Sequence, residues 1–236
     1  MRIFQRFTFF IVAILLSAGI TGCSQKFNDV NDTLSIALFG DNDTELASDD
    51  VQRLPYASLY AQVDDGPQAF MVLALAEPAL SLTDVSLTQN TRTQLKWVSS
   101  DKGMLVTEGG RLVKSMNLPQ GNLIETYSSQ PDPLTLGLQR ASTPMHWQRT
   151  IDWQPGYHFG YQLTSRFARQ DNAVIMVNER PVETWHFIES VTIDALDTHY
   201  QNQFWIDGKT GKVLKSQQTL APGLPVIDMT LLKPYS

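Results

Sequence analysis

Four histidines and a set of carboxylates are the side chains that could bind a metal ion or move protons in this chain. The histidines are His146, His158, His186 and His199, and none lies four residues from another, the spacing of two ligands on one helical face. His186 and Glu189 are three residues apart in an expected strand, so their side chains point to opposite faces. We therefore predict no metal site.

Acid–base catalysis of glycoside hydrolysis needs two carboxyl groups a few ångströms apart across a groove. The acids available in the second half of the chain include Asp152, Glu179, Glu183 and Glu189. A chain with 24 Asp and Glu carries such residues without a catalytic reason. The motifs typical of serine hydrolases, zinc proteases, P-loop enzymes and dinucleotide-binding proteins are absent from the sequence. We expect no catalytic residue and no cofactor, and we keep a polysaccharide hydrolase as the least favoured alternative.

The lone cysteine, Cys23, ends a segment with the features of a secretory signal. A basic start is followed by an apolar run over residues 7–20, which is shorter than the about 20 residues that span a bilayer. The sequence Ile20-Thr21-Gly22-Cys23 resembles the bacterial lipobox, in which the cysteine is lipidated and becomes the first residue of the mature chain. We predict a lipoprotein signal peptide over residues 1–22 and lipidation at Cys23.

The predicted lipid makes a membrane the first expected partner. Two or three acyl chains on one residue hold a protein to a membrane stably, whereas a single chain binds reversibly. Ser24 follows the cysteine, at the position where an aspartate favours retention in the inner membrane in enteric-type sorting. We therefore expect an outer-membrane protein at the periplasmic face, with residues 23–33 as the acylated cysteine and a tether.

Aromatic residues are dense between positions 147 and 161. Trp147, Trp153, Tyr157 and Tyr161 could stack against sugar rings, beside glutamine and histidine side chains that form hydrogen bonds. Aromatic side chains are also common in strands, where they form the core face of a sheet. We favour the core for Phe159 and expect Trp153 and Tyr157 to be the exposed members of a candidate polysaccharide-binding site.

The rest of the chain predicts a mainly β fold. Apolar and polar residues alternate with the period of a strand, in segments separated by Gly, Pro, Asn and Asp turns. The segments span residues 56–63, 70–76, 95–99, 104–107, 112–116, 147–153, 157–167, 173–178, 183–193, 200–206, 213–219 and 226–232. Short helices are expected after Ser48 and Pro131, an amphipathic helix over 27–38, and an irregular surface insertion over 77–94. The lack of βαβ alternation disfavours a parallel sheet.

We expect one mainly-β domain over residues 34–236, built as a curved antiparallel sheet or a two-sheet half-barrel with a few short helices. Residues 110–115 and 211–216 match class for class, and each follows a tight turn. Two related lobes would produce such a match. Two unrelated hairpins would also produce it, because half-exposed strands alternate apolar and basic side chains.

Composition excludes several classes of protein. The net charge is −6, so a nucleic-acid partner is not expected. With 42% hydrophobic and 18% charged residues, the chain has the balance of a globular protein. A single cysteine excludes an intramolecular disulfide framework.

An ordered series of short strings runs along the chain: Leu54-Pro55-Tyr56-Ala57-Ser58, Gly103-Met104-Leu105-Val106-Thr107, Gln130-Pro131-Asp132-Pro133-Leu134, Gln203-Phe204-Trp205-Ile206-Asp207 and Met229-Thr230-Leu231-Leu232-Lys233-Pro234. Through this series the chain resembles the YjbF/GfcB family, the group 4 capsule polysaccharide lipoproteins. The resemblance implies a lipoprotein encoded with exopolysaccharide or capsule genes and a strongly curved antiparallel sheet. It supplies no catalytic residue. The hairpin around residues 205–213 is also similar to lipoprotein carriers of the LolA type.

From this resemblance we expect a non-catalytic outer-membrane lipoprotein that assists polysaccharide assembly or export. Its expected partners are the membrane, through lipid on Cys23, together with the polymer or other proteins of the export system. The alternative is a carrier that shelters an acyl chain or a lipid-linked intermediate inside the curved sheet. An unfilled apolar concavity would favour the carrier, and a polar groove with exposed tryptophans would favour polymer binding.

Overall fold

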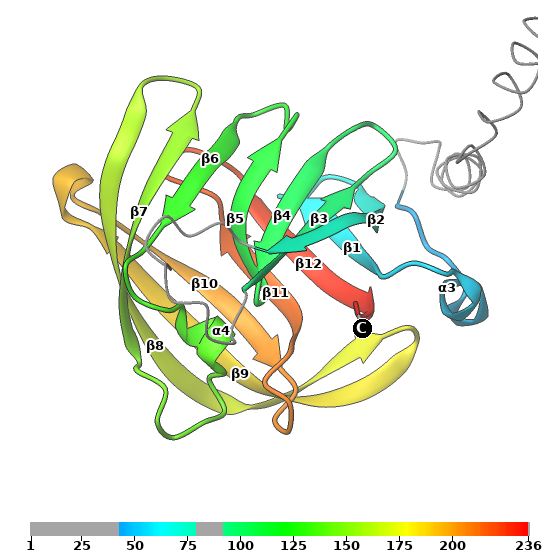
Figure 1. Cartoon of the computed structure of the whole chain (residues 1–236). Helices are drawn as coiled ribbons and strands as arrows, with labels where there is room; N and C mark the ends of the chain where they lie inside the picture. The colour runs from blue at the N-terminus through cyan, green and yellow to red at the C-terminus, as the bar shows by residue number, and fades with distance from the viewer. Residues whose placement is uncertain (1–42, 79–91, 236) are drawn as a thin grey trace, which may run out of the picture. The chain divides into compact units, whose positions relative to one another are not determined.

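The computed structural model describes residues 43–78 and 92–235, which belong to one compact unit (Figure 1). The predicted signal peptide, Cys23, the tether and the expected helix over 27–38 lie outside the described residues, as does most of the insertion predicted over 77–94. None of the helices in the described part of the chain combines the length and apolarity needed to cross a membrane.

Twelve strands form one antiparallel sheet, and three short helices accompany it within the described ranges. The helices are α3 (Ser48–Arg53), α4 (Pro133–Leu136) and the 3₁₀ turn η2 (Asp194–Leu196). The strands are β1 (Ser58–Val63), β2 (Gln68–Pro78), β3 (Thr93–Val98), β4 (Met104–Glu108), β5 (Arg111–Met116), β6 (Asn122–Tyr127), β7 (His146–Gln154), β8 (His158–Val177), β9 (Arg180–Ile193), β10 (Thr198–Ile206), β11 (Val213–Thr219) and β12 (Val226–Lys233).

The strand order is that of a meander whose first and last strands meet. It runs β5-β4-β3-β2-β1-β12-β11-β10-β9-β8-β7-β6, so neighbouring strands are consecutive in sequence except for β1 and β12. In that one long-range pair, Leu59 lies opposite Leu231 and Ala61 lies opposite Met229. The two ends of the β unit are therefore joined in the middle of the sheet.

The edge strands β5 and β6 also lie side by side (Figure 1), and side chains connect them. The backbone N–H of Leu123 donates to Ser115 Oγ at 3.0 Å, and the N–H of Leu118 donates to Asn122 Oδ1 at 3.1 Å. We call this contact the β5–β6 seam. It nearly closes the sheet on itself, so the expected mainly-β, curved antiparallel fold is confirmed, as one sheet rather than two.

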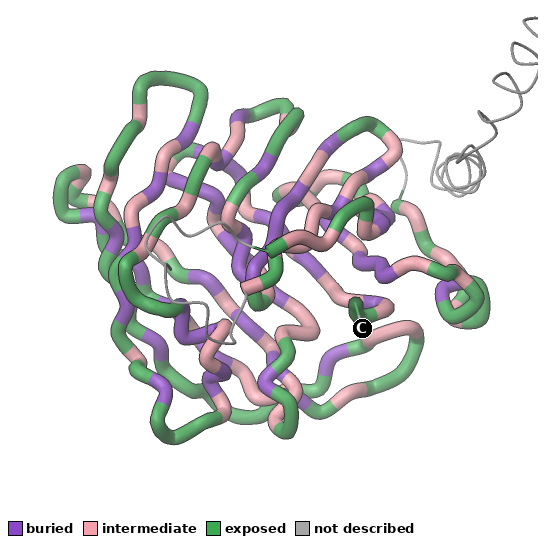
Figure 2. The backbone as a smooth tube through the Cα atoms, in the orientation of Figure 1, coloured by how far each residue is buried: buried purple, intermediate pink, exposed green. Residues whose placement is uncertain are grey.

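Alternation along each strand places one face in the interior, and buried positions line the inside of the sheet in Figure 2. On β7, for example, Trp147, Arg149, Ile151 and Trp153 are buried and their neighbours are more exposed. The buried hydrophobic residues form two clusters. The smaller one packs α4 against the inner faces of β7 to β10 and contains Leu134, Leu138, Trp147, Phe167, Phe187, Phe204 and Ile206.

The structure departs from the predicted elements at two strands. The segments predicted over 157–167 and 173–178 are parts of one strand, β8, whose pairing with β9 shifts register between Arg169 and Asn172. That irregular stretch is polar and exposed, which is why the sequence pattern predicts a break there. The edge strand β6 lies outside all of the predicted segments.

Candidate functional site

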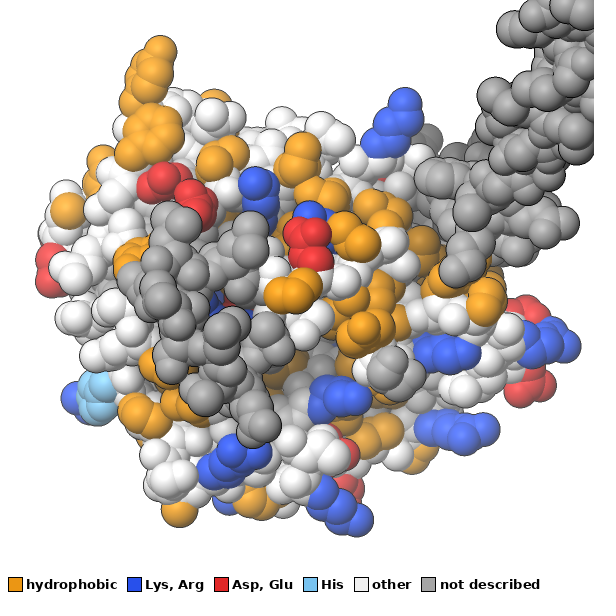
Figure 3. Space-filling model, in the orientation of Figure 1, with side chains coloured by type: hydrophobic (Ala, Val, Ile, Leu, Met, Phe, Trp, Pro, Cys, Tyr) orange, Lys and Arg blue, Asp and Glu red, His pale blue; other side chains and the backbone are white. Residues whose placement is uncertain are grey.

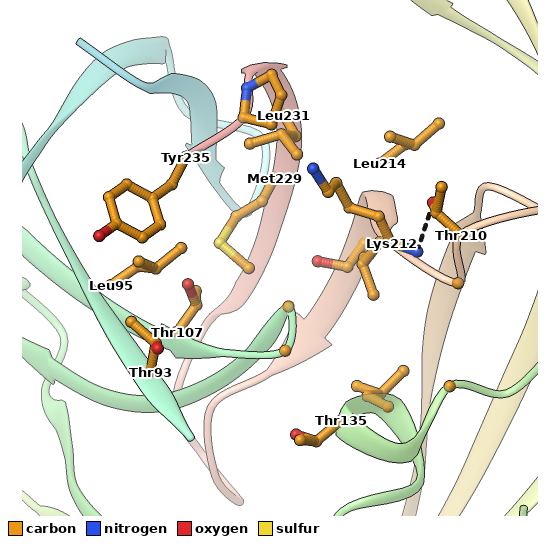
Figure 4. Close-up of a pocket in the computed structure, with 18 of the residues that line it drawn as sticks. Thr93, Leu95, Thr107, Thr135, Thr210, Lys212, Leu214, Met229, Leu231 and Tyr235 are labelled. Atoms are coloured by element: carbon orange, nitrogen blue, oxygen red, sulfur yellow. Dashed lines mark hydrogen bonds between the residues drawn. The ribbon is translucent and has the colours of Figure 1, made fainter. Parts of the chain in front are cut away.

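A pocket of about 450 Å³ lies where α4 and two strand-connecting turns meet. Its walls come from β3, the β4–β5 turn, α4, the β10–β11 turn and the end of β12 (Figure 4). We call it the α4 pocket. Its volume is within the range of about 300–1,000 Å³ that is typical of small-molecule sites. The α4 pocket is therefore the candidate binding site.

Most of the pocket wall is apolar. The apolar residues that line it are Leu59, Leu95, Trp97, Leu134, Leu136, Val213, Leu214, Met229, Leu231, Pro234 and Tyr235. Hydroxyl groups are contributed by Thr93, Thr107, Thr135, Thr210 and Ser216. Figure 3 shows hydrophobic side chains gathered on this face of the molecule, with Lys and Arg side chains around them.

The charged residues that border the pocket are all basic among the described residues. They are Arg92, Arg140, Lys212 and Lys215. The Lys215 amine lies 5.5 Å from the centroid of the Trp205 ring, and Arg92 forms an ion pair of 3.4 Å with Glu108. Burial raises the pKa of Glu108, and the Arg92 charge opposes that rise. Arg140 and Lys212 are exposed and have no ion-pair partner in the described part of the chain.

The β10–β11 turn places Lys212 at the pocket. The backbone N–H groups of Lys209 and Thr210 donate to one Asp207 carboxylate oxygen at 2.7 and 2.8 Å. These hydrogen bonds, the one from Thr210 first, lower the pKa of Asp207 and keep the carboxylate charged. The N–H of Lys212 in turn donates to Thr210 Oγ1 at 3.3 Å. Figure 4 shows the Lys212 side chain extending into the pocket from this turn.

The β4–β5 turn forms the part of the wall between β11 and α4, because both of its glycines allow close contact with these elements. A Cβ at Gly110 would lie 2.5 Å from the Cβ of Val213, and one at Gly109 would lie 2.8 Å from Thr135 Oγ1. Both glycines also have positive φ, at 60° and 92°. The turn can therefore pack against β11 and α4 only if these positions lack side chains.

Asp132 connects α4 to the interior of the sheet. Its carboxylate accepts a hydrogen bond from the N–H of Leu134 at 2.9 Å and caps the helix. The same carboxylate forms a buried ion pair with Arg111 of β5. The guanidinium of Arg111 lies 4.7 Å from the Trp147 ring centroid. The position of the pocket wall thus depends on a buried charge.

A buried ion cluster extends from Arg111 across the interior. Glu189 accepts hydrogen bonds from Arg111 at 3.0 Å, from Arg149 at 2.9 Å and from Asn202 at 2.8 Å. Burial alone would raise the pKa of Glu189, but the two guanidinium charges and these hydrogen bonds outweigh it and lower the pKa to about 2. We call these residues, with Asp132, the buried ion cluster. Its charges balance, so it joins β5, β7, β9 and β10 as a structural group.

The predicted sugar-stacking aromatics do not form one surface. Trp147 and Trp153 are 5% and 2% exposed, because they face the interior from β7, so the prediction that Trp153 is exposed is wrong. Tyr161 packs partly buried against the core. Tyr157 is 93% exposed in the β7–β8 turn, as expected, whereas Phe159, predicted in the core, is 58% exposed.

The candidate acids are separated by their positions in the sheet. Asp152 lies on β7 and accepts a hydrogen bond from the N–H of Gly160 at 2.7 Å, whereas Glu179 lies in the β8–β9 turn. Glu183 is exposed on β9, whereas Glu189 is in the buried ion cluster. In the described ranges, no group of three or more His, Cys, Asp and Glu side chains is placed to hold a metal ion.

The expected separation of His186 and Glu189 to opposite faces is confirmed. Glu189 is fully buried inside the sheet, and the His186 ring stacks on Trp205 with centroids 4.7 Å apart. His158 stacks on Trp153 at 4.3 Å. These rings are packed against tryptophans.

Sequence reasoning missed the α4 pocket and its basic residues. The one signal that could have found it was the match between residues 110–115 and 211–216, because both of these turns line the pocket. The strands after them also touch: Gln218 accepts from Leu112 N–H at 3.0 Å and donates to the carbonyl of Gly110 at 2.9 Å. A single sequence does not reveal this contact.

Comparisons with known proteins agree on one group. The family model described as "Group 4 capsule polysaccharide lipoprotein gfcB, YjbF" matches residues 31–232. The uncharacterized lipoprotein GfcB of Escherichia coli K12 is 32% identical over 95% of this chain and 98% of its own. The uncharacterized lipoprotein YjbF of the same strain is 33% identical over 93% of this chain and 95% of its own. The crystal structure of the hypothetical lipoprotein YmcC, also from Escherichia coli K12, has a TM-score of 0.68 and 32% identity and covers 87% of this chain and 96% of its own.

Proposed function

Because this chain belongs to the family of group 4 capsule polysaccharide lipoproteins, we propose that it assists the assembly or export of a capsular or related exopolysaccharide as a non-catalytic binding protein. In this proposal, lipid on Cys23 holds the protein at the periplasmic face of the outer membrane. Residues 23–33 act as its tether. The folded sheet binds a component of the export pathway.

The α4 pocket is the observation that carries the proposal of binding without catalysis. Apolar side chains make up most of its wall, and no Asp or Glu among the described residues lines it. The most deeply buried acid, Glu189, is held by two arginines and an asparagine, which leaves it no role in proton transfer. A pocket of this kind supports binding and supplies no acid–base pair.

The same pocket favours one form of this function over another. A polymer-binding protein would be expected to present tryptophans along a polar groove, but Trp147 and Trp153 are buried. An open apolar concavity is instead the feature expected of a carrier for an acyl chain or a lipid-linked intermediate. We therefore propose the carrier, which would use the α4 pocket, as a second candidate function. For polymer binding, which belongs to the first candidate function, the exposed Tyr157 is the remaining candidate site.

A complementation experiment tests the proposal in the producing strain. Cells lacking this chain should lose surface polysaccharide, and the wild-type chain should restore it. Cys23→Ala should release the protein from the membrane fraction and fail to restore export. Asp152→Asn and Glu183→Gln should restore export fully, since neither acid has a catalytic role here. If one of these two variants accumulates folded at the membrane and still fails, that carboxylate is required for export and the proposed binding through the α4 pocket without acid–base chemistry is wrong.

A further inference from the structure

The α4 pocket has an apolar wall and a basic border, and this combination points to a particular class of ligand. We propose that the pocket binds an anionic amphiphile, with an acyl or isoprenoid chain against the apolar wall and a phosphate or carboxylate head at Arg140 and Lys212. This inference rests on the carrier form of the proposed function and names its ligand.

The apolar part of the pocket is suited to a hydrocarbon chain. Leu95, Met229 and Leu231 line it from β3 and β12 (Figure 4), and Leu134 and Leu136, which belong to α4, line it as well. Contact between such a surface and water is unfavourable, and a hydrocarbon chain that covers it is stabilised in proportion to the apolar area removed from water. A hydrated sugar would leave most of its hydroxyl groups without partners on this wall.

The charge at the pocket is opposite to that of the chain as a whole. The net charge is −6, yet among the residues that the structure describes no acid lines the pocket, and Arg92, Arg140 and Lys212 all border it. Arg92 is partly neutralised by Glu108, so Arg140 and Lys212 are the cations best placed for a ligand. Positive charge gathered at the opening of an apolar pocket complements an anionic head.

Photo-crosslinking of the full lipidated chain in phosphatidylcholine vesicles tests the inference. The probes are palmitic acid, palmityl phosphate and palmityl alcohol, each carrying a diazirine on the chain, and adducts are located by mass spectrometry. We expect both anionic probes to label the strands that line the pocket. The double variant Arg140→Glu/Lys212→Glu should reduce this labelling by at least about tenfold, because the loss of even one of its two charge-assisted contacts weakens binding by that factor.

Matched controls separate this inference from the proposed function. The double variant Arg166→Glu/Arg180→Glu changes two exposed arginines that do not line the pocket and should leave labelling unchanged. If acid, phosphate and alcohol label the pocket equally in every variant, the anionic head is wrong and the carrier function stands. If none labels the pocket, both are wrong. If excess purified exopolysaccharide abolishes labelling, the pocket is a polymer site and the inference is overturned.

Discussion

Glu189 is the residue on which the interior of the sheet most depends. It is fully buried, and removing its charge would leave Arg111 facing only Asp132 and Arg149 without a carboxylate. Breaking a buried ion pair in this way costs about 3–5 kcal/mol. Glu189→Gln should lower the free energy of unfolding by that amount in a urea titration. Glu183→Gln, at an exposed position on the same strand, should change it by less than about 0.5 kcal/mol.

The same carboxylate predicts how stability depends on pH. The pKa of Glu189 falls from 4.5 to about 2 on folding, so its contribution is fully present above about pH 4.5 and is lost as the pH falls toward 2. Urea midpoints measured between pH 7 and pH 2.5 should therefore converge for the wild type and Glu189→Gln as the pH falls. Curves that stay parallel over this range would contradict the assigned role.

Trp153 and Tyr157 are four residues apart but have opposite roles. Trp153 is buried beneath the His158 ring, and Trp153→Ala should destabilise the protein by about 3–5 kcal/mol. Tyr157→Ala should leave the melting temperature unchanged because the side chain is almost fully exposed. Binding of purified exopolysaccharide, measured on both variants, then shows whether Tyr157 contacts the polymer. A stable Trp153→Ala variant would mean that the tryptophan is not part of the core.

At the scale of elements, the β4–β5 turn holds two walls of the pocket together. Gly110→Ala adds both the strain of a positive φ, about 1–3 kcal/mol, and a collision with Val213 of β11. Gly160→Ala is the matched control, because φ is 71° there and nothing lies within 4 Å of the added Cβ. Thermal melts should show a clearly larger loss for Gly110→Ala. Equal losses would show that the turn does not need its close contact with β11.

The elements that the sequence predicts best are those with local signals. The Gly109-Gly110 and Asp207–Gly211 turns and most strands follow from turn residues and alternation, and the structure has them there. The sequence pattern does not predict β6 because only one of its six residues, Leu123, is buried and its partner strand, β7, lies beyond α4 in the sequence. The burial of Trp153 does not follow from the sequence because alternation does not say which face of a strand is inside. The pocket and the buried ion cluster join residues far apart in sequence, such as Arg111 and Glu189, and a single sequence does not pair them.

At the scale of the whole molecule, the β5–β6 seam decides whether the sheet stays closed. Ser115 is fully buried there, and its hydroxyl accepts the hydrogen bond from Leu123 N–H. Ser115→Ala should cost about 0.5–1.5 kcal/mol and speed hydrogen exchange at the Leu123 amide. Ser190→Ala, at an exposed position on β9, should change neither. An unchanged Leu123 amide in Ser115→Ala would show that backbone packing alone closes the seam.

The pairing of β1 with β12 has a consequence for how the molecule is made. While the chain is being synthesised, β2 to β11 can form hairpins with neighbours that already exist, but one edge of β1 has no partner until Val226–Lys233 has emerged. Exposed edge strands readily pair with other chains and promote aggregation. The free edge of β1 therefore needs protection until β12 pairs with it, and a chain that lacks β12 should aggregate more readily than the complete chain.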